Sequence, residues 1–267
     1  MFAYPRPTIV VAALALAAAL APAAADAQDW QFAITPYLWL PNIEGTGDAE
    51  TDSGARPDVE IGPVDYLERL EFALMLSGEA RRENWVLRAD LVYVDFGHQR
   101  SSVRSVSGPG GLVEFPVNTD TTTSLDGLEW QATLGYLVVN EPNLSLELLG
   151  GFRYLDVSFD LDWEFESPLS LLPQSGHLSQ DVSLLDVIVG THGRYTFGGG
   201  KWFVPFHFDI GTGDSDLTWQ LLAGVGYAFS WGDVLLAYRH LDYDQKHGDL
   251  LQGVSLSGPA IGVSFRF

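Results

Sequence analysis

The chain has 267 residues, a formal net charge of −21 and no cysteine. Without cysteine it can have neither a disulfide scaffold, nor a thiol nucleophile, nor a cysteine-ligated metal. The excess of 35 acidic over 14 basic side chains argues against a nucleic-acid partner, because phosphates select the opposite balance. Long, soluble acidic loops account for this charge more simply.

The first segment has the pattern of a secretory signal peptide. Residues 1–8 carry one positive charge, at Arg6, and an apolar run follows over 9–20. Ala25-Asp26-Ala27 then has the form of a cleavage site. The apolar run is too short to span a bilayer. We therefore predict a signal peptide over 1–27 and one outer-membrane β-barrel domain over 28–267.

Ten segments have the length and alternation of transmembrane strands, which need about 9–11 residues. The predicted strands are 30–40, 70–82, 84–97, 123–139, 143–160, 181–197, 201–211, 217–231, 233–243 and 254–267. Short turns alternate with longer connections, and the longer ones are 41–69, 98–122, 161–180 and 244–253. Outer-membrane barrels have this asymmetry between short periplasmic turns and longer extracellular loops.

The last strand illustrates the predicted faces. Ile261, Val263, Phe265 and Phe267 share one face, while small or polar residues occupy the other. Aromatic residues recur near strand ends, as expected for the girdles of a membrane barrel; these are Trp30, Trp85, Tyr93, Trp130, Trp202, Trp219, Trp231 and Tyr243. A soluble β-sandwich would alternate too, but we favour an all-β transmembrane antiparallel barrel of about ten strands, within about 8–12.

Several motifs resemble a family of uncharacterised proteobacterial outer-membrane β-barrel proteins. They are TPYLWLP at 35–41, LEFALM at 70–75, GGFRYLD at 150–156, SDLTWQ at 215–220 and the C-terminal FRF at 265–267. The resemblance extends over essentially the whole mature chain. It implies a barrel in the bacterial outer membrane, and it implies no activity and no catalytic residues.

Charged residues on the predicted inward faces are the candidate lumen-lining site. They are Arg88, Asp90, Arg153, Asp186, Arg194, His207, Asp209 and Arg239. Because buried charges persist when they are paired, we expect a salt-bridged network that fills a narrow lumen. The alternative is a charged constriction in a pore for small solutes.

Neither an enzyme nor a cofactor site is predicted. His207 and Asp209 share a face and could form an acid–base dyad, but no nucleophile elbow or Ser-His-Asp order accompanies them. The acidic loop at 41–69 lacks the spacing of a calcium-binding loop, so we predict no specific metal site.

The expected function is therefore that of a non-enzymatic envelope protein with acidic extracellular loops and a polar, largely plugged lumen. A narrow passive channel is the second hypothesis, and an outer-membrane hydrolase is the third. The expected partners are outer-membrane lipid, lipopolysaccharide and, through the strand that ends at Phe267, the barrel-assembly machinery. We predict no nucleic-acid partner and no particular oligomeric state.

Overall fold

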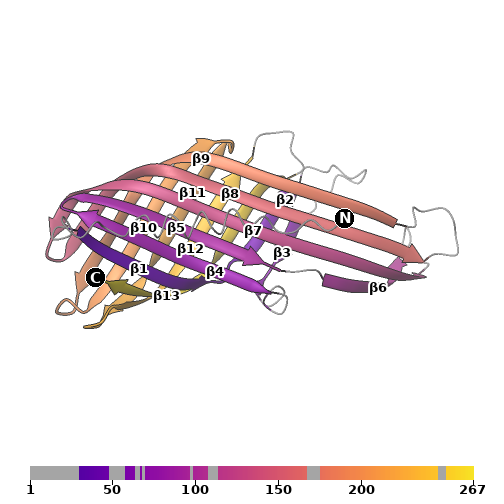
Figure 1. Cartoon of the computed structure of the whole chain (residues 1–267), viewed down its shortest axis with the longest axis horizontal. Helices are drawn as coiled ribbons and strands as arrows, with labels where there is room; N and C mark the ends of the chain where they lie inside the picture. The colour runs from indigo at the N-terminus through magenta and orange to yellow at the C-terminus, as the bar shows by residue number, and fades with distance from the viewer. Residues whose placement is uncertain are drawn as a thin grey trace.

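The computed structural model describes residues 30–47, 58–63, 67, 70–96, 99–107, 114–166, 175–245 and 251–267. The predicted signal peptide lies outside them. Ten strands form a closed antiparallel barrel; in order around the wall they are β1 (Trp30–Trp39), β4 (Phe72–Arg82), β5 (Trp85–Asp95), β7 (Glu114–Glu141), β8 (Leu144–Glu166), β9 (Ser175–Phe197), β10 (Trp202–Gly213), β11 (Leu217–Ala228), β12 (Asp233–Asp244) and β13 (Leu251–Arg266). Pairing of β1 with β13 closes the barrel (Figure 1). The predicted fold class and all ten strands are confirmed. Within the described part of the chain, no helix is long and apolar enough to cross a bilayer.

The two ends of the barrel differ. The turn end carries the short connections at 83–84, 142–143, 198–201 and 229–232, together with Trp30 and Phe267. The loop end carries the longer connections. Gly198, Gly199 and Gly200 have φ values of 61°, 71° and 87°, which glycine adopts without steric cost and which allow the tight β9–β10 turn.

The predicted long loops contain more strand than expected, so their predicted extent is wrong. The segment 41–69 contains β2 (Asn42–Gly47) and β3 (Asp58–Ile61), and β6 (Gln99–Ser107) lies within 98–122. Strands β7, β8 and β9 have 28, 23 and 23 residues and continue past the other strands at the loop end (Figure 1). A strand outside a bilayer needs no continuous apolar face, and β6 is largely polar. The end of β8 does alternate in sequence, with Leu161, Trp163 and Phe165 between acidic residues, so its extension could have been predicted.

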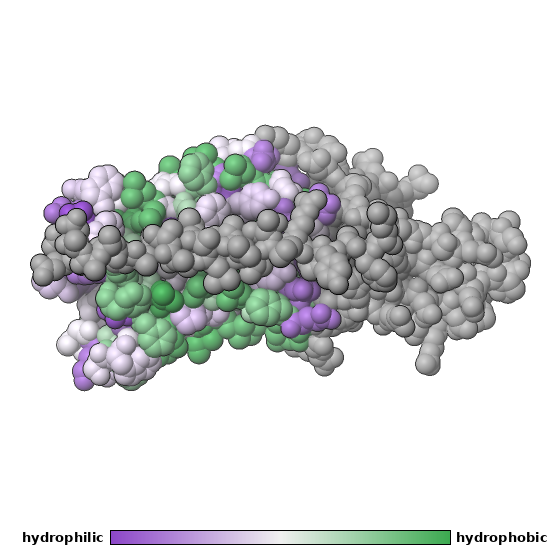
Figure 2. Space-filling view, in the orientation of Figure 1, coloured by the Kyte–Doolittle hydropathy of each residue, from purple (hydrophilic) through white to green (hydrophobic). Residues whose placement is uncertain are grey.

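An apolar belt covers the outside of the barrel. Ile261, Leu236 and Val225 pair across β13, β12 and β11 and are 53%, 55% and 40% exposed. In the coloured part of Figure 2, hydrophobic residues gather above and below the centre of the view, with hydrophilic residues towards the two ends. Inward residues on the same strands are buried, such as Ala260 and Arg239. The predicted in–out alternation is therefore confirmed.

Aromatic side chains border this belt at both ends. Trp85, Trp202 and Trp231 are exposed at the turn end, and Trp85 packs edge-on against Tyr136. Outward aromatic residues also occur towards the loop end, where Phe72 packs on Tyr93. The segment from Trp85 to Tyr93 spans nine residues, which matches the about 9–11 needed to cross the hydrocarbon core. Tyr243 was assigned to this girdle incorrectly: it points inward and is 1% exposed.

Gly151 on β8 offers a test of the register. An added Cβ would lie 2.0 Å from the carbonyl oxygen of Ala132, whereas an added Cβ at Gly78 on β4 would meet nothing within 4 Å. We expect Gly151→Ala to lower the free energy of unfolding by about 1–3 kcal/mol, because neighbouring backbone must move. Gly78→Ala should have a much smaller effect. Urea titration of the refolded barrel, followed by tryptophan fluorescence, measures both; equal midpoints would contradict the pairing of β7 with β8.

Candidate functional site in the barrel interior

Arg153 is the centre of the charged network in the barrel. It comes from β8 and is 0% exposed. Its Nη2 donates to both carboxylate oxygens of Asp209 on β10, at 2.8 and 2.7 Å, and to Gln131 on β7 at 3.0 Å. Its Nη1 donates to the hydroxyl of Thr218 on β11 at 3.1 Å. One buried guanidinium therefore joins four strands across the lumen.

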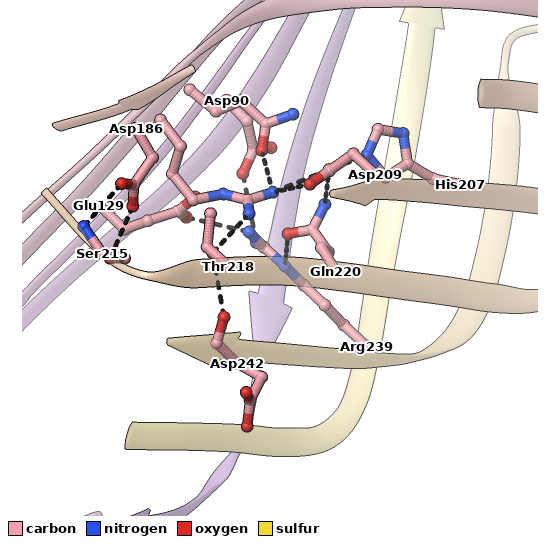
Figure 3. Close-up of polar contacts among 12 residues, drawn as sticks. Asp90, Glu129, Asp186, His207, Asp209, Ser215, Thr218, Gln220, Arg239 and Asp242 are labelled. Atoms are coloured by element: carbon pink, nitrogen blue, oxygen red, sulfur yellow. Dashed lines mark hydrogen bonds and ion pairs between the residues drawn. The ribbon is translucent and has the colours of Figure 1, made fainter. Parts of the chain in front are cut away.

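Arg239 on β12 makes a second set of contacts in the same layer. It donates to Gln220 at 2.9 Å and to Glu129 at 2.9 Å (Figure 3). A further donor lies 3.2 Å from Asp90. Its guanidinium stacks 4.4 Å from the ring centroid of Trp39. Glu129 also lies 3.7 Å from the Nε of Arg153, so this carboxylate is shared by the two arginines.

Arg88 and Arg194 lie closer to the turn end. Arg88 bridges Glu79 at 2.8 Å and Glu147 at 3.0 Å. Arg194 donates to Asp233 at 2.5 Å, and the same Asp233 oxygen accepts a contact from Arg266. Two guanidinium groups therefore share one carboxylate at this end.

Asp186 is inward and fully buried, but it has no arginine partner among the described residues. Its carboxylate accepts the backbone N–H of Ser215 at 2.9 Å and the hydroxyl of Ser215 at 2.8 Å. Figure 3 shows this pair beside the network. Asp186 therefore holds the β10–β11 turn in place.

An apolar layer fills the lumen on the loop-end side of the network. Its buried members come from seven strands and pack as one cluster; they are Trp39, Met75, Val92, Leu155, Leu184, Leu241, Tyr243 and Ala260. Tyr243 and Leu241 are 1% and 0% exposed, so solvent does not reach them.

A cavity of about 890 Å³ occupies the turn-end half of the lumen. It begins among the turns, at Pro142 and Gly200, and ends at Arg239 and Gln220 of the network. Its wall is mostly polar in residue type, because inward positions in this half of the barrel carry arginine, carboxylate, serine, threonine and histidine side chains.

All eight candidate residues lie on the inward face, and they fall into three groups. Asp90, Arg153, His207, Asp209 and Arg239 share the central network, while Arg88 belongs to the Glu79–Glu147 cluster and Arg194 to the Asp233 cluster. Asp186 stands apart with Ser215.

Several contributors were not foreseen, among them Gln131 and Thr218, which accept from Arg153. Tyr37 donates to Asp90 at 2.8 Å, although its motif suggested only a family resemblance. Trp39 stacks on Arg239 from the same motif. Asp233 begins the predicted strand 233–243 but was not among the candidate residues, although it pairs with both Arg194 and Arg266. The period-2 pattern was the signal that could have placed Tyr37 and Trp39 inside, since Leu38 between them is apolar and faces out.

The predicted dyad of His207 and Asp209 does form, with a distance of 2.6 Å between Nε2 and Oδ2. Both oxygens of this carboxylate also accept from Arg153. No serine or threonine hydroxyl contacts His207 among the residues described. The pair is therefore built like a structural ion-pair network, and a nucleophile would have to come from elsewhere. Within the described ranges, no group of three or more His, Asp or Glu side chains is arranged to hold a metal ion.

The fold and the interior define the class: a closed ten-stranded antiparallel β-barrel with an apolar exterior and a charged interior. No protein-family model and no curated protein sequence matches the chain. Among solved structures, the outer membrane protease OmpT from Escherichia coli is 13% identical, with 90% of this chain and 97% of that chain covered and a TM-score of 0.45. The translocator domain of the autotransporter NalP from Neisseria meningitidis is 13% identical, with 97% and 96% covered and a TM-score of 0.43. The attachment invasion locus protein Ail of Yersinia pestis is 10% identical, with 90% and 99% covered and a TM-score of 0.32. At these scores the likenesses support no conclusion about activity or location.

The central network predicts that the free energy of unfolding depends strongly on Arg153. Arg153→Met leaves the buried carboxylate of Asp209 without its main partner, so we expect a loss of about 3–5 kcal/mol in the free energy of unfolding. Arg82→Met is the control, because Arg82 is exposed and only stacks on Trp30 at 5.7 Å; it should cost less than about 1 kcal/mol.

Adding Asp209→Asn to Arg153→Met should recover part of the loss, because it removes the unpaired charge. Equilibrium unfolding of all four proteins in urea measures these differences. Equal losses for Arg153→Met and Arg82→Met would show that Arg153 is hydrated.

Proposed function

We propose that this protein is an integral outer-membrane β-barrel of the bacterial envelope. The observation that carries the proposal is the apolar belt between aromatic borders on a closed barrel whose charges point inward. A closed barrel leaves no unpaired strand edge, which is the condition for strands to cross hydrocarbon. The signal-peptide pattern at 1–27 supports export. Membership of the uncharacterised outer-membrane family suggested by the motifs is part of the same proposal.

The barrel acts without catalysis, and its lumen is largely plugged. Two successive layers support this: the Arg153–Arg239 network and the apolar cluster around Trp39 and Tyr243. Water and small solutes entering the turn-end cavity meet paired charges first and then a dry layer. The acidic loop end is then the part available to other envelope components.

Its partners in this proposal are outer-membrane lipid and lipopolysaccharide around the belt, and the barrel-assembly machinery at the last strand. Phe267 is 70% exposed, while its backbone exchanges hydrogen bonds with Phe32 at 2.9 and 3.0 Å. The aromatic side chain is thus presented at the barrel surface while its backbone completes the closure.

Ile261 tests the membrane placement of the belt. It lies midway between the turn-end Phe265 and the loop-end Ser257 on β13 and is 53% exposed. We expect Ile261→Arg to lower the free energy of unfolding in phospholipid vesicles by about 2–4 kcal/mol, since a charge at the bilayer midplane is poorly solvated.

Leu217→Arg is the matched control, because Leu217 is exposed at the loop end of β11. Near the interface the same change should cost about 0–1 kcal/mol. Urea unfolding in vesicles measures both; the same small cost at the two positions would place the belt in water.

Planar-bilayer recording tests the plugged lumen. The wild-type barrel should give no discrete openings, because the apolar layer excludes hydrated ions. Removing the two largest aromatic side chains of that layer, with Trp39→Ala and Tyr243→Ala together, should create salt-dependent unitary steps. Leu38→Ala is the control, since Leu38 faces outward and is 41% exposed. Refolding of each variant is checked first by heat-modifiable gel mobility.

A narrow passive channel is the second candidate, favoured by the cavity of about 890 Å³ that already opens half of the lumen. Unitary steps in the wild-type barrel, with a selectivity altered by Arg88→Ala, would establish it in place of the plugged barrel. A hydrolase is the third candidate and rests on the His207–Asp209 pair. It requires ester or peptide turnover that His207→Ala abolishes.

A further inference from the structure

The wall of the turn-end cavity does not share the acidity of the chain. Five arginines and four carboxylates line it; these are Arg81, Arg88, Arg194, Arg239 and Arg266 with Glu79, Asp90, Glu147 and Asp233. The whole sequence has a net charge of −21. Glu129, which does not line the cavity, also pairs with Arg239, so the charges in and around the wall are balanced inside a protein this acidic.

The arginines are not equally well paired along the cavity. At the floor, Arg239 is fully occupied by Gln220, Asp90 and Glu129. Arg88 is likewise held between Glu79 and Glu147. These guanidinium groups have their charge balanced by protein carboxylates and offer little to a ligand.

Near the mouth, each arginine has, within the described residues, only a carboxylate that it shares with another arginine. Arg194 and Arg266 share a single oxygen of Asp233, and the Arg266 side chain is 57% exposed. Arg81 has only a 3.4 Å ion pair with Glu79, and its buried Nε has no hydrogen-bond acceptor. Arg81 and Arg266 flank β1 on its two sides, since Gln31 pairs with Arg81 and Ala33 pairs with Arg266.

Further donors line the wall, with Ser145 beside Arg194 near the mouth and His192 deeper in the cavity. His192 lies in van der Waals range of His207, with ring centroids 5.7 Å apart, and no hydrogen bond to either of its ring nitrogens is found within the described residues. Ser145 lies opposite Arg194 in the β8–β9 pair and also lines the cavity. Neutral and charged N–H and O–H groups at such positions are the groups that bind carboxylate and phosphate oxygens.

We propose that this cavity is a binding site for a small solute or headgroup that carries a carboxylate or phosphate. Arg81, Arg194 and Arg266 bind the anionic group at the mouth, and the polar wall up to His192 receives the rest of the molecule. The volume of about 890 Å³ lies within the range of ligand pockets, about 300–1,000 Å³. The site exists whether or not the lumen conducts, because it depends only on the turn-end half of the barrel.

Isothermal titration calorimetry on the full barrel in non-ionic micelles tests the site. The probes are inorganic phosphate, succinate, dihexanoyl phosphatidylglycerol and, as a zwitterionic control, dihexanoyl phosphatidylcholine. We expect saturable binding of at least one of the three anionic probes, weakened by added sodium chloride. Binding of phosphate or succinate identifies a free solute as the ligand class, and binding of phosphatidylglycerol alone identifies a lipid headgroup.

The decisive comparison is between neighbouring arginines. Arg81→Gln combined with Arg266→Gln should weaken binding at least about tenfold, which is the effect of losing one or two charged hydrogen bonds. Arg82→Gln removes the same charge from the next residue, which is exposed and does not line the cavity; it should change binding by less than about twofold. Absence of saturable binding for all three anions, or equal weakening by Arg82→Gln, would overturn the proposal. Unchanged gel mobility of each variant shows that the barrel has folded.

Discussion

The side chain of Arg153 is entirely hidden from solvent, and the interior of the barrel is organised around that fact. A buried guanidinium is stable only when its charge and donors are matched by protein groups. Asp209, Gln131 and Thr218 provide that match from three other strands. Since these strands are not all neighbours, the contacts form only when the sheet closes into a barrel of this width. The network therefore depends on closure and also stabilises it.

The same contacts set the register of the strands. A slip of one residue would move every inward side chain of a strand to the outside. For β8 this slip would place Arg153 in the apolar belt, where a charge near the midplane costs about 2–4 kcal/mol. It would also leave Asp209 with His207 as its remaining close partner. The glycine at position 151 adds a steric constraint to the same strand. The charged contacts of Arg153 and the close backbone approach at Gly151 thus favour one strand register. Burial of the apolar layer around Leu241 stabilises the same register on the loop-end side.

The sequence predicted the ten strands and their faces because the two faces of a membrane strand contact different surroundings, lipid outside and a polar lumen inside. Apolar and polar residues therefore alternate along each strand. The sequence predicted which charges face inward, such as Arg153 and Asp209, but apart from the His207–Asp209 pair it did not predict which ones meet. Contacts such as Arg153 to Thr218 join residues 65 positions apart, and only the order and shear of the strands determine them. The apolar layer was missed for a related reason. Trp39 and Tyr243 look like girdle residues in sequence, and only the phase of their strands turns them inward. The largely polar β6 left no hydropathy pattern to detect, whereas the end of β8 alternates through Leu161, Trp163 and Phe165 and could have been predicted as strand.

The position of the cavity links binding to stability. Its floor is made by Arg239 and Gln220, which are also members of the central network. A ligand can enter from the turn end and stop there without disturbing any pair, whereas passage to the loop end requires Arg239 to leave Glu129 and Trp39. That step would leave the buried carboxylate of Glu129 with only the 3.7 Å ion pair to Arg153, and losing the partner of a buried charge costs several kcal/mol. A side chain that fixes register is therefore a poor gate. This is why the geometry favours a barrel that holds a small anion at one end over one that conducts it across.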